Sequence, residues 1–155
     1  MTIRLSENFR ALFYAPFYAT QATGAFEAAG VEVAMVPSPS PGAAVAVLRA
    51  GEVDVMWGGP LRVMMLHDAE PACDLVCFCD VVARDPFFII GAKPRPGFRF
   101  ADLKGLRFAT VSEVPTPWIC LANDVRHAGV DPGALDRSDD KTMAENEAAL
   151  AAGEL

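Results

Sequence analysis

Four short loops carry the residues best suited to contact a small polar ligand. They occupy residues 8–14, 38–42, 57–60 and 112–116, and each is predicted to join the end of a β-strand to the start of a helix. In an open parallel sheet, ligands bind beyond the carboxyl ends of the strands. Helix N-termini at that edge offer free N–H groups and a partial positive charge. The loops therefore favour a small polar or anionic ligand, such as a carboxylate, a sulfonate or a phosphate.

The candidate ligand-binding residues combine aromatic rings, hydroxyl groups, amide or charged groups and two glycines. Aromatic rings stack on flat ligands, and glycines let the backbone approach them closely. Hydroxyl and amide groups donate hydrogen bonds. We expect ligand contacts from Asn8, Phe13, Tyr14, Ser38, Ser40, Trp57, Gly58, Gly59, Arg84, Glu113 and Thr116.

Several of these residues also have a purely structural interpretation. Trp57 suits a ring that caps the core as well as one that stacks on a ligand, and Phe13 and Tyr14 share that ambiguity. Ser38 and Ser40 belong to an alternation of Pro and Ser that is common in ordinary loops. The sequence leaves both interpretations open.

The charged candidates also allow both a ligand-binding and a structural interpretation. Glu113 is suited to accept hydrogen bonds from an amine-bearing ligand, such as an aminopyrimidine, or to be a solvated carboxylate in the first turn of a helix. Arg84 is suited to reach a ligand or to form a surface ion pair with Asp85. His67 and His127 each lie near a predicted helix C-terminus, where a cation has a structural role.

Alternating strand and helix patterns are predicted to position the first three loops. Glycines at positions 30 and 51 suit the left-handed residue that ends a helix. Three strand–helix repeats predict a parallel sheet with helices on its faces. The predicted strands are 3–5, 31–36 and 53–57, and the predicted helices are 16–29, 43–50 and 61–67.

A second α/β unit is predicted to follow an extended connection. The connection comprises a strand at residues 75–82 and an extended segment at 87–91. A helical turn at 100–105, a strand at 106–111 and a helix from Pro117 to residue 127 then restart the pattern. The fourth candidate loop, which holds Glu113 and Thr116, belongs to this second unit.

Three landmarks recur in the same order about a hundred residues apart. Residues 46–53 read AVLRAGEV and residues 148–155 read AALAAGEL; Pro-Phe and Ala-Gly-Val in the first half also match Pro-Trp and Ala-Gly-Val in the second. The recurrence indicates two similar units. Because the first copy continues into a strand where the second stops, we expect an incomplete second unit with an exposed sheet edge and a tendency to self-associate.

Composition narrows the classes of partner. The formal net charge is -7, which argues against nucleic acid or an anionic membrane as a partner. We find no signal peptide and no apolar run long enough to cross a bilayer. The four cysteines, Cys73, Cys77, Cys79 and Cys120, fit no zinc spacing, and Cys77 and Cys79 are expected to be small core residues in a strand. We predict no metal site, no cofactor and no catalytic constellation.

The order of these motifs resembles one family. Residues 48–54 (LRAGEVD), residues 102–107 (DLKGLR) and residues 150–154 (LAAGE) together resemble the substrate-binding proteins of ABC importers. The branch that they resemble is the NMT1-like one, whose ligands are nitrate, sulfonates, taurine and the pyrimidine precursor of thiamine.

The resemblance implies an α/β, two-lobed, type II periplasmic-binding-protein-like fold, with parallel-rich sheets and helices on both faces. The first lobe would span residues 1–82, the hinge 83–91, and an incomplete second lobe 92–155. A small ligand would be held between the lobes, and an ABC permease would be the partner. The location implied is periplasmic or membrane-associated if a leader has been removed, and cytoplasmic if the chain begins at Met1.

Two alternative functions remain. A thiamine-pyrimidine synthase resembles the same region, but Gly58 and Arg62 stand where that enzyme has Lys and His. Its Cys-rich motif also follows the hinge, whereas Cys77 and Cys79 precede it, so we predict that the protein is not an enzyme. The effector domain of a transcription regulator has a similar fold but needs a basic DNA-binding segment before Met1.

Overall fold

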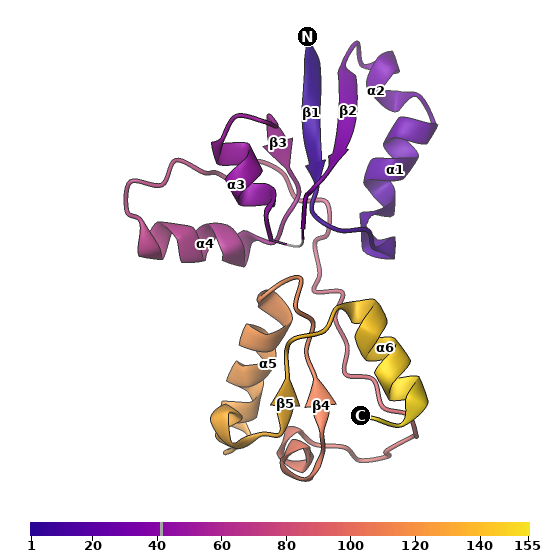
Figure 1. Ribbon diagram of the computed structural model, residues 1–155, viewed down its shortest axis with the longest axis vertical. Coiled ribbons are helices and arrows are strands. Elements are labelled where there is room, and N and C mark those ends of the chain that lie inside the picture. The colour runs from indigo at the N-terminus through magenta and orange to yellow at the C-terminus, as the bar shows by residue number, and fades with distance from the viewer. Residues whose placement is uncertain (41) are drawn as a thin grey trace. The chain divides into compact units, whose positions relative to one another are not determined.

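The chain folds into two compact units, Met1–Pro86 and Phe87–Leu155 (Figure 1). The computed structural model describes residues 1–40 and 42–155; position 41 of the candidate loop 38–42 lies outside the described residues. The division falls inside residues 83–91, the predicted hinge. The hinge role of that segment and the predicted lobe limits remain predictions.

The first unit is built on a three-stranded parallel sheet with strand order β2-β1-β3. Its central strand, β1, pairs with β2 from Thr2 and Glu32 through to Glu7 and Pro37, and with β3 at Leu5. Its elements are β1 (Thr2–Glu7), a 3₁₀ turn (Leu12–Tyr14), α1 (Ala15–Ala22), α2 (Ala25–Ala28), β2 (Glu32–Pro37), α3 (Ala44–Arg49), β3 (Val55–Met56) and α4 (Pro60–Ala69).

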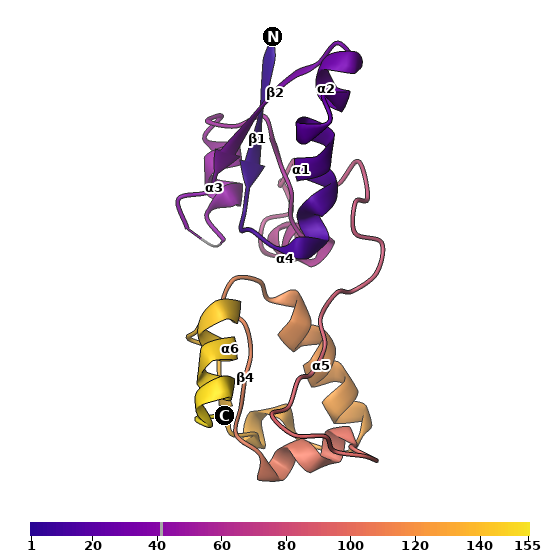
Figure 2. The same ribbon diagram turned by 90° about the vertical axis from the view of Figure 1, so that its right-hand side faces the viewer.

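Helices cover both faces of this sheet. Figure 2 shows α1 and α3 on opposite sides of β1. Side chains alternate between the faces of a strand, so Leu5 and Glu7 share the face toward α1, while Ser6 points to the other face. On the α1 face, Leu5, Tyr14 and Trp57 form the core of the unit, each less than a tenth exposed.

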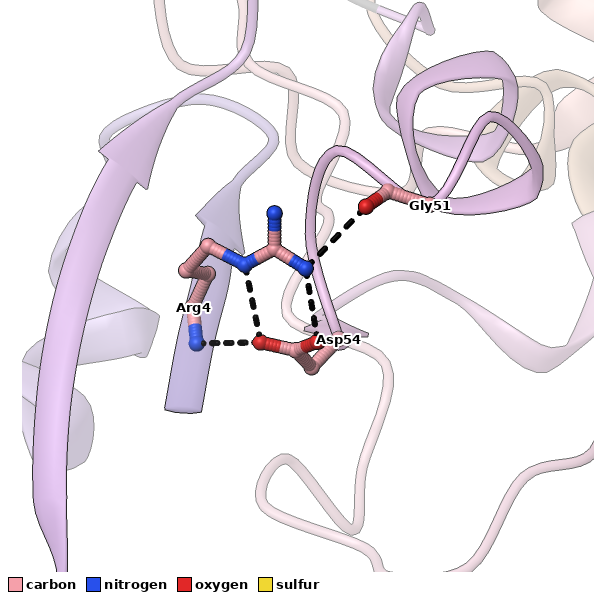
Figure 3. A network of polar contacts seen from close by, with 3 residues as sticks. All are labelled: Arg4, Gly51 and Asp54. Atoms are coloured by element: carbon pink, nitrogen blue, oxygen red, sulfur yellow. Dashed lines mark hydrogen bonds and ion pairs between the residues drawn. The ribbon is translucent and has the colours of Figure 1, made fainter. Parts of the chain in front are cut away.

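An arginine of β1 fastens the turn that precedes β3 (Figure 3). Arg4 donates to Asp54 from Nε (to Oδ2, 3.0 Å) and from Nη2 (to Oδ1, 2.8 Å), and Nη2 also donates to the carbonyl oxygen of Gly51 at 3.0 Å. The hydrogen bonds from Arg4 lower the pKa of Asp54 to about 2. This contact fixes the entry of β3 beside β1.

The second unit repeats the strand–helix order with shorter strands. The parallel pair β4 (Phe108–Ala109) and β5 (Arg137–Ser138) is flanked by α5 (Thr116–His127) and α6 (Met143–Ala152), with 3₁₀ turns at Phe100–Gly105 and Pro132–Ala134. Its core is formed by Leu103, Val125 and Val130, each at most 3% exposed.

The repeated sequence motif has a structural counterpart at two helix ends. Gly51 and Gly153 have φ angles of +71° and +78°, the left-handed conformation that ends a helix. The next residue then donates back into the helix, from Glu52 N to Val47 O at 3.1 Å and from Glu154 N to Ala149 O at 2.9 Å. Both copies therefore end α3 and α6 with the same turn.

The predicted helix over residues 16–29 is wrong in one respect. Gly24, with a φ of +69°, divides it into α1 and α2. The predicted end at Gly30 is confirmed, since Gly30 has a φ of +71° and donates to Glu27 O. A left-handed glycine inside a helical pattern interrupts the helix because the hydrogen-bonded ladder cannot pass through it.

The predicted strand at residues 75–82 is also wrong. The structure describes every residue of 75–91 and assigns no strand there. A strand needs a neighbouring strand for its backbone hydrogen bonds, and none lies beside this segment within the described chain. Its apolar side chains are consequently exposed; Val76 is 76% and Phe78 is 73% exposed.

The cysteines of that segment are therefore not core residues. Cys77 and Cys79 are exposed, and so is Cys120, whereas Cys73 is buried. The predicted strands 53–57 and 106–111 shorten to the two residues each of β3 and β4. Across the described part of the chain, no helix is long and apolar enough to span a membrane.

Candidate functional site

The carboxyl ends of β1 and β2 are held together by hydrogen bonds from the loop that follows β2. The backbone N–H of Ser38 donates to Glu7 O at 2.7 Å. The backbone N–H of Gly42 donates to Asn8 Oδ1 at 3.1 Å. Asn8 is only 4% exposed, so the loop after β2 packs against a buried side chain of the loop after β1.

Three buried polar groups near these strand ends have no hydrogen-bond partner among the described residues. They are Ser6 Oγ, Asn8 Nδ2 and Trp57 Nε1. Each can donate a hydrogen bond, and leaving a buried donor unsatisfied costs about 1–3 kcal/mol. Ser6 and Trp57 lie on opposite sides of the sheet, because Trp57 packs with the α1 face. The edge as a whole is therefore rich in donors.

The aromatic candidates lie in one cluster of rings. Trp57 stacks on Phe17 with 4.4 Å between ring centroids, and Tyr14 lies 5.2 Å from Trp57. Phe13, partly buried, lies 4.6 Å from Tyr14. Burial raises the pKa of Tyr14. These contacts place Trp57 in the core, as its structural interpretation expects; contact of the three rings with a ligand remains a prediction.

A buried carboxylate also lies at the end of β1. Tyr18 donates its hydroxyl hydrogen to Glu7 Oε1 at 2.5 Å, and Arg10 Nε donates to the same oxygen at 3.2 Å. Burial raises the pKa of Glu7, but hydrogen bonds from Arg10 and Tyr18 together bring it below its ordinary value. Burial and the bond to Glu7 raise the pKa of Tyr18 to about 12. Glu7 is therefore an ionised acceptor that the sequence analysis missed.

The two serines of the second loop contact each other. Ser38 Oγ donates to the carbonyl oxygen of Ser40 at 2.9 Å, a bond typical of an ordinary loop. Ser40 is exposed and Ser38 is partly buried. Their contact with a ligand remains a prediction.

The glycines after β3 lead directly into α4. Gly59 is the N-cap residue of α4 and Pro60 opens the helix. Gly59 has no side chain to cap this N-terminus, and the first turn of α4 has no acidic residue. A Cβ on Gly58 would lie 2.9 Å from Cε of Met56, so a side chain there would displace that methionine. In this first turn Pro60 has no N–H, and the N–H of Arg62 donates to Gly59 O at 3.2 Å.

Arg62, in the first turn of α4, is a second residue at this edge that the sequence analysis did not select as a ligand contact. An ideal Cβ on Gly42 would lie 3.3 Å from Arg62 Nη1 and 3.9 Å from Nη2. Arg62 also lies near enough to Tyr14 to oppose the rise in that residue's pKa that burial causes. The available signal was an arginine two residues after a Gly-Gly-Pro helix start, where a positive charge is disfavoured.

Glu113, the acidic candidate of the second unit, holds the start of another helix. It is 7% exposed, and its Oε1 accepts from the backbone N–H of Met143, the first residue of α6, at 2.9 Å. It precedes α5, so the interpretation as a solvated carboxylate in the first turn of that helix is wrong. Thr116 is the first residue of α5 and is partly buried. The predicted ligand contacts of both residues are untested.

A second cluster of polar side chains lies around the ends of β4 and β5. Arg137 Nη1 donates to Thr110 Oγ1 at 2.7 Å, its Nη2 lies 2.7 Å from Asp139 Oδ2, and its guanidinium carbon lies 4.2 Å from the centre of the Trp118 ring. Asn146 Nδ2 donates to Thr110 O at 3.1 Å. The sequence analysis selected none of these residues as ligand contacts, and the two hydrogen bonds to Thr110 join segments about 30 residues apart.

The remaining candidate, Arg84, is exposed and lies in the predicted hinge segment. Its contact with a ligand remains a prediction. Within the described residues, no group of three or more His, Cys, Asp or Glu side chains is placed to hold a metal ion.

Comparison with known proteins gives a family and a fold. The family model described as "NMT1/THI5 like" matches residues 13–151. A solved structure, the alkanesulfonate-binding protein SsuA from Xanthomonas axonopodis pv. citri bound to MOPS, superposes with a TM-score of 0.64 at 18% identity. The match covers 99% of this chain and 52% of that protein, so the chain spans about half its length. No curated protein sequence gives a significant match. The predicted α/β fold of the type II periplasmic binding proteins is confirmed.

Proposed function

The chain belongs to the NMT1/THI5-like family, and from this premise we propose that it is the solute-binding component of an ABC importer, with a small polar or anionic ligand. The observation that carries the proposal is the donor-rich edge formed by the carboxyl ends of β1 to β3. There Asn8 Nδ2 is buried without a partner among the described residues, and the first turn of α4 has no side-chain cap. Such donors suit the oxygen atoms of a bound anion.

Among small polar or anionic ligands, we propose sulfonates first. Nitrate, taurine and an aminopyrimidine are the alternatives to be tested beside them. SsuA, which has a similar fold, is an alkanesulfonate-binding protein. A sulfonate stays ionised at all physiological pH values and offers three acceptor oxygens, which matches an edge rich in donors. The periplasm is the proposed location, since a solute-binding component meets its ligand there.

We further propose that the protein binds its ligand without converting it chemically. Gly58 and Arg62 occupy the positions at which the thiamine-pyrimidine synthases have Lys and His. The synthases have a Cys-rich motif after the hinge. In this chain Cys77 and Cys79 precede the predicted hinge and are exposed on a segment without regular structure. These departures support a binding protein over the synthase.

The test is thermal unfolding of the full chain against nitrate, alkanesulfonates, taurine and aminopyrimidines. A ligand that binds only the folded state adds about 2.7 kcal/mol of stability at 100 times its Kd, which is a shift of several degrees. We expect one class to raise the melting temperature and to be recovered chemically unchanged by mass spectrometry. A flat response to all four classes contradicts the proposal, and a converted ligand contradicts the absence of catalysis.

A further inference from the structure

Cys77 and Cys79 lie two positions apart in the sequence, and the structure exposes both thiols. The sequence analysis expects them in the core, and their exposure removes that reason for excluding a metal ion. Residues 73–80 belong to no helix, strand or turn. Val76 and Phe78, which alternate with the cysteines, are 76% and 73% exposed, so both sides of the segment are open. Both sulfurs are therefore accessible to an ion from solution.

The covalent chain keeps the two sulfurs within reach of one ion. Cα atoms two residues apart are separated by at most roughly 7 Å, because one residue spans at most about 3.6 Å. In an extended segment, such side chains point to the same side. Cysteines joined by an S–S bond of about 2 Å have Cα separations of about 4–7 Å. A metal ion between two sulfurs spans more than that bond, so Cys77 and Cys79 can hold one ion within their own segment.

The groups nearest in sequence do not extend this pair to a larger set of ligands. His67, in the last turn of α4, has Nε2 2.8 Å from the carbonyl oxygen of Leu75, to which it donates. Cys73 is only 8% exposed. Across residues 1–40 and 42–155, no three or more His, Cys, Asp or Glu side chains are grouped to hold a metal ion. The donor set is therefore two sulfurs.

Two sulfurs without a third protein ligand narrow the choice of ion. Structural zinc sites almost always have four ligands, and iron–sulfur clusters are typically held by four. Calcium takes six to eight oxygen ligands. Cu(I) is a soft ion that thiolates select, and it forms stable complexes with two of them. The pair thus fits Cu(I) better than these other ions.

We propose that Cys77 and Cys79 bind one Cu(I) ion through their two sulfurs. Each thiol loses its proton to solvent and forms one S–Cu bond, so binding releases two protons and transfers no electron. Neither cysteine is among the candidate ligand contacts. The proposal therefore goes beyond the proposed function and does not depend on it.

The test is an anaerobic titration of the reduced full chain with Cu(I), in competition with the coloured Cu(I) chelator bicinchoninate. We expect one ion per chain. Cys77→Ser and Cys79→Ser should each weaken binding by about 100-fold or more, because each removes a ligand, and losing a group that only orients a ligand already costs about 10- to 100-fold. Cys120→Ser, which removes an exposed thiol far from the pair in sequence, is the matched control and should bind like the wild type.

The opposite results overturn the proposal. If Cys77→Ser or Cys79→Ser binds Cu(I) as tightly as the wild type, the two sulfurs are not the site. One ion per two chains would exclude a site within one chain, and displacement of Cu(I) by equimolar Zn²⁺ would show further ligands. Sulfonate binding by Cys77→Ser should match the wild type, so the proposed function and the copper site can fail separately.

A metal-free measurement excludes a merely structural role. Because both thiols are exposed, Cys77→Ser and Cys79→Ser should unfold at the wild-type temperature in the absence of copper. A melting temperature lower by several degrees in either variant would show that the thiol is packed in the core, and would overturn the proposal.

Discussion

Two helices that follow parallel strands, α4 in the first unit and α6 in the second, begin in opposite ways. At α6, Thr142 Oγ1 accepts from the N–H of Glu145, and the carboxylate of Glu145 accepts from the N–H of Thr142. Glu113 then accepts from Met143 N. At α4, no side chain caps the N-terminus, and the first turn carries Arg62. The second unit supplies carboxylate acceptors to the start of α6, whereas the first turn of α4 has no acidic residue.

The sheets of the two units also differ in strand length and in the number of strands. In the first unit β1 is six residues long and has a strand on each side. In the second unit β4 is two residues long and pairs with β5 alone within the described residues. The longer sheet gives the first unit a firmer framework, which suits the part of the molecule that carries a donor-rich edge. The following variants are arranged as matched pairs across this contrast.

The largest difference is expected between the two tryptophans. Trp57→Ala removes a ring that is 4% exposed and stacked on Phe17, so it should lower the free energy of unfolding by about 3–5 kcal/mol. Trp118→Ala removes a partly buried ring whose main partner is Arg137, and about 1–2 kcal/mol is expected. Urea titration followed by circular dichroism measures both. Equal losses would contradict the assignment of Trp57 to the core.

The next difference concerns two left-handed glycines of the first unit. Gly42→Ala and Gly30→Ala both place a side chain at positive φ, which costs about 1–2 kcal/mol. The new methyl group meets Arg62 at Gly42 but nothing within 4 Å at Gly30. Both variants should lose stability in urea titration, and Gly42→Ala should lose more, because its methyl group crowds the Arg62 guanidinium. Equal losses in the two variants would show that the contact between Gly42 and Arg62 does not constrain the loop.

A smaller effect tests the self-capped helix of the second unit. Thr142→Ala removes the side-chain oxygen that accepts from Glu145 N, and should lower the stability by about 1 kcal/mol. Because Thr142 and Glu145 lie at the start of α6 and not at the donor-rich edge, ligand affinity should stay at the wild-type value in calorimetry. A loss of affinity would mean that the α6 N-terminus contributes to binding.

The smallest effect is a pH dependence of the first unit. Arg4 lowers the pKa of Asp54 from 3.8 to about 2 in the folded chain. The contribution of Asp54 to stability is therefore fully present above pH 3.8 and is lost as the pH falls toward 2. Asp54→Asn should be less stable than the wild type at pH 6, and the two should converge near pH 2 in thermal unfolding. A constant difference over that range would exclude the titration of Asp54 as the cause.

Local signals in the sequence predicted most of the framework. The left-handed glycines at positions 30 and 51 depend on neighbours along the chain, and the structure has them where they were expected. Alternation of apolar residues failed at residues 75–82, because a strand also needs a partner that the pattern does not encode.

The site residues were harder to predict for the same reason. Gly42 and Arg62 are 20 positions apart, and Glu113 and Met143 are 30 apart, so no local pattern links them. Sequence reasoning selected the loops at the strand ends, but not the arginine that the fold brings to the loop after β2. What was missing is the crossing of the chain from β2 through α3 and β3, which delivers α4 to the loop after β2.

The central position of β1 determines when the sheet can be completed during synthesis. Its partner Asp54 lies 50 residues further along the chain than Arg4, so β1 leaves the ribosome long before β3 does. At roughly 5–20 residues per second, several seconds pass in which one edge of β1 has no neighbour. For that interval the nascent chain exposes a strand edge, and a chaperone that shields such edges would act on this protein before its sheet is closed.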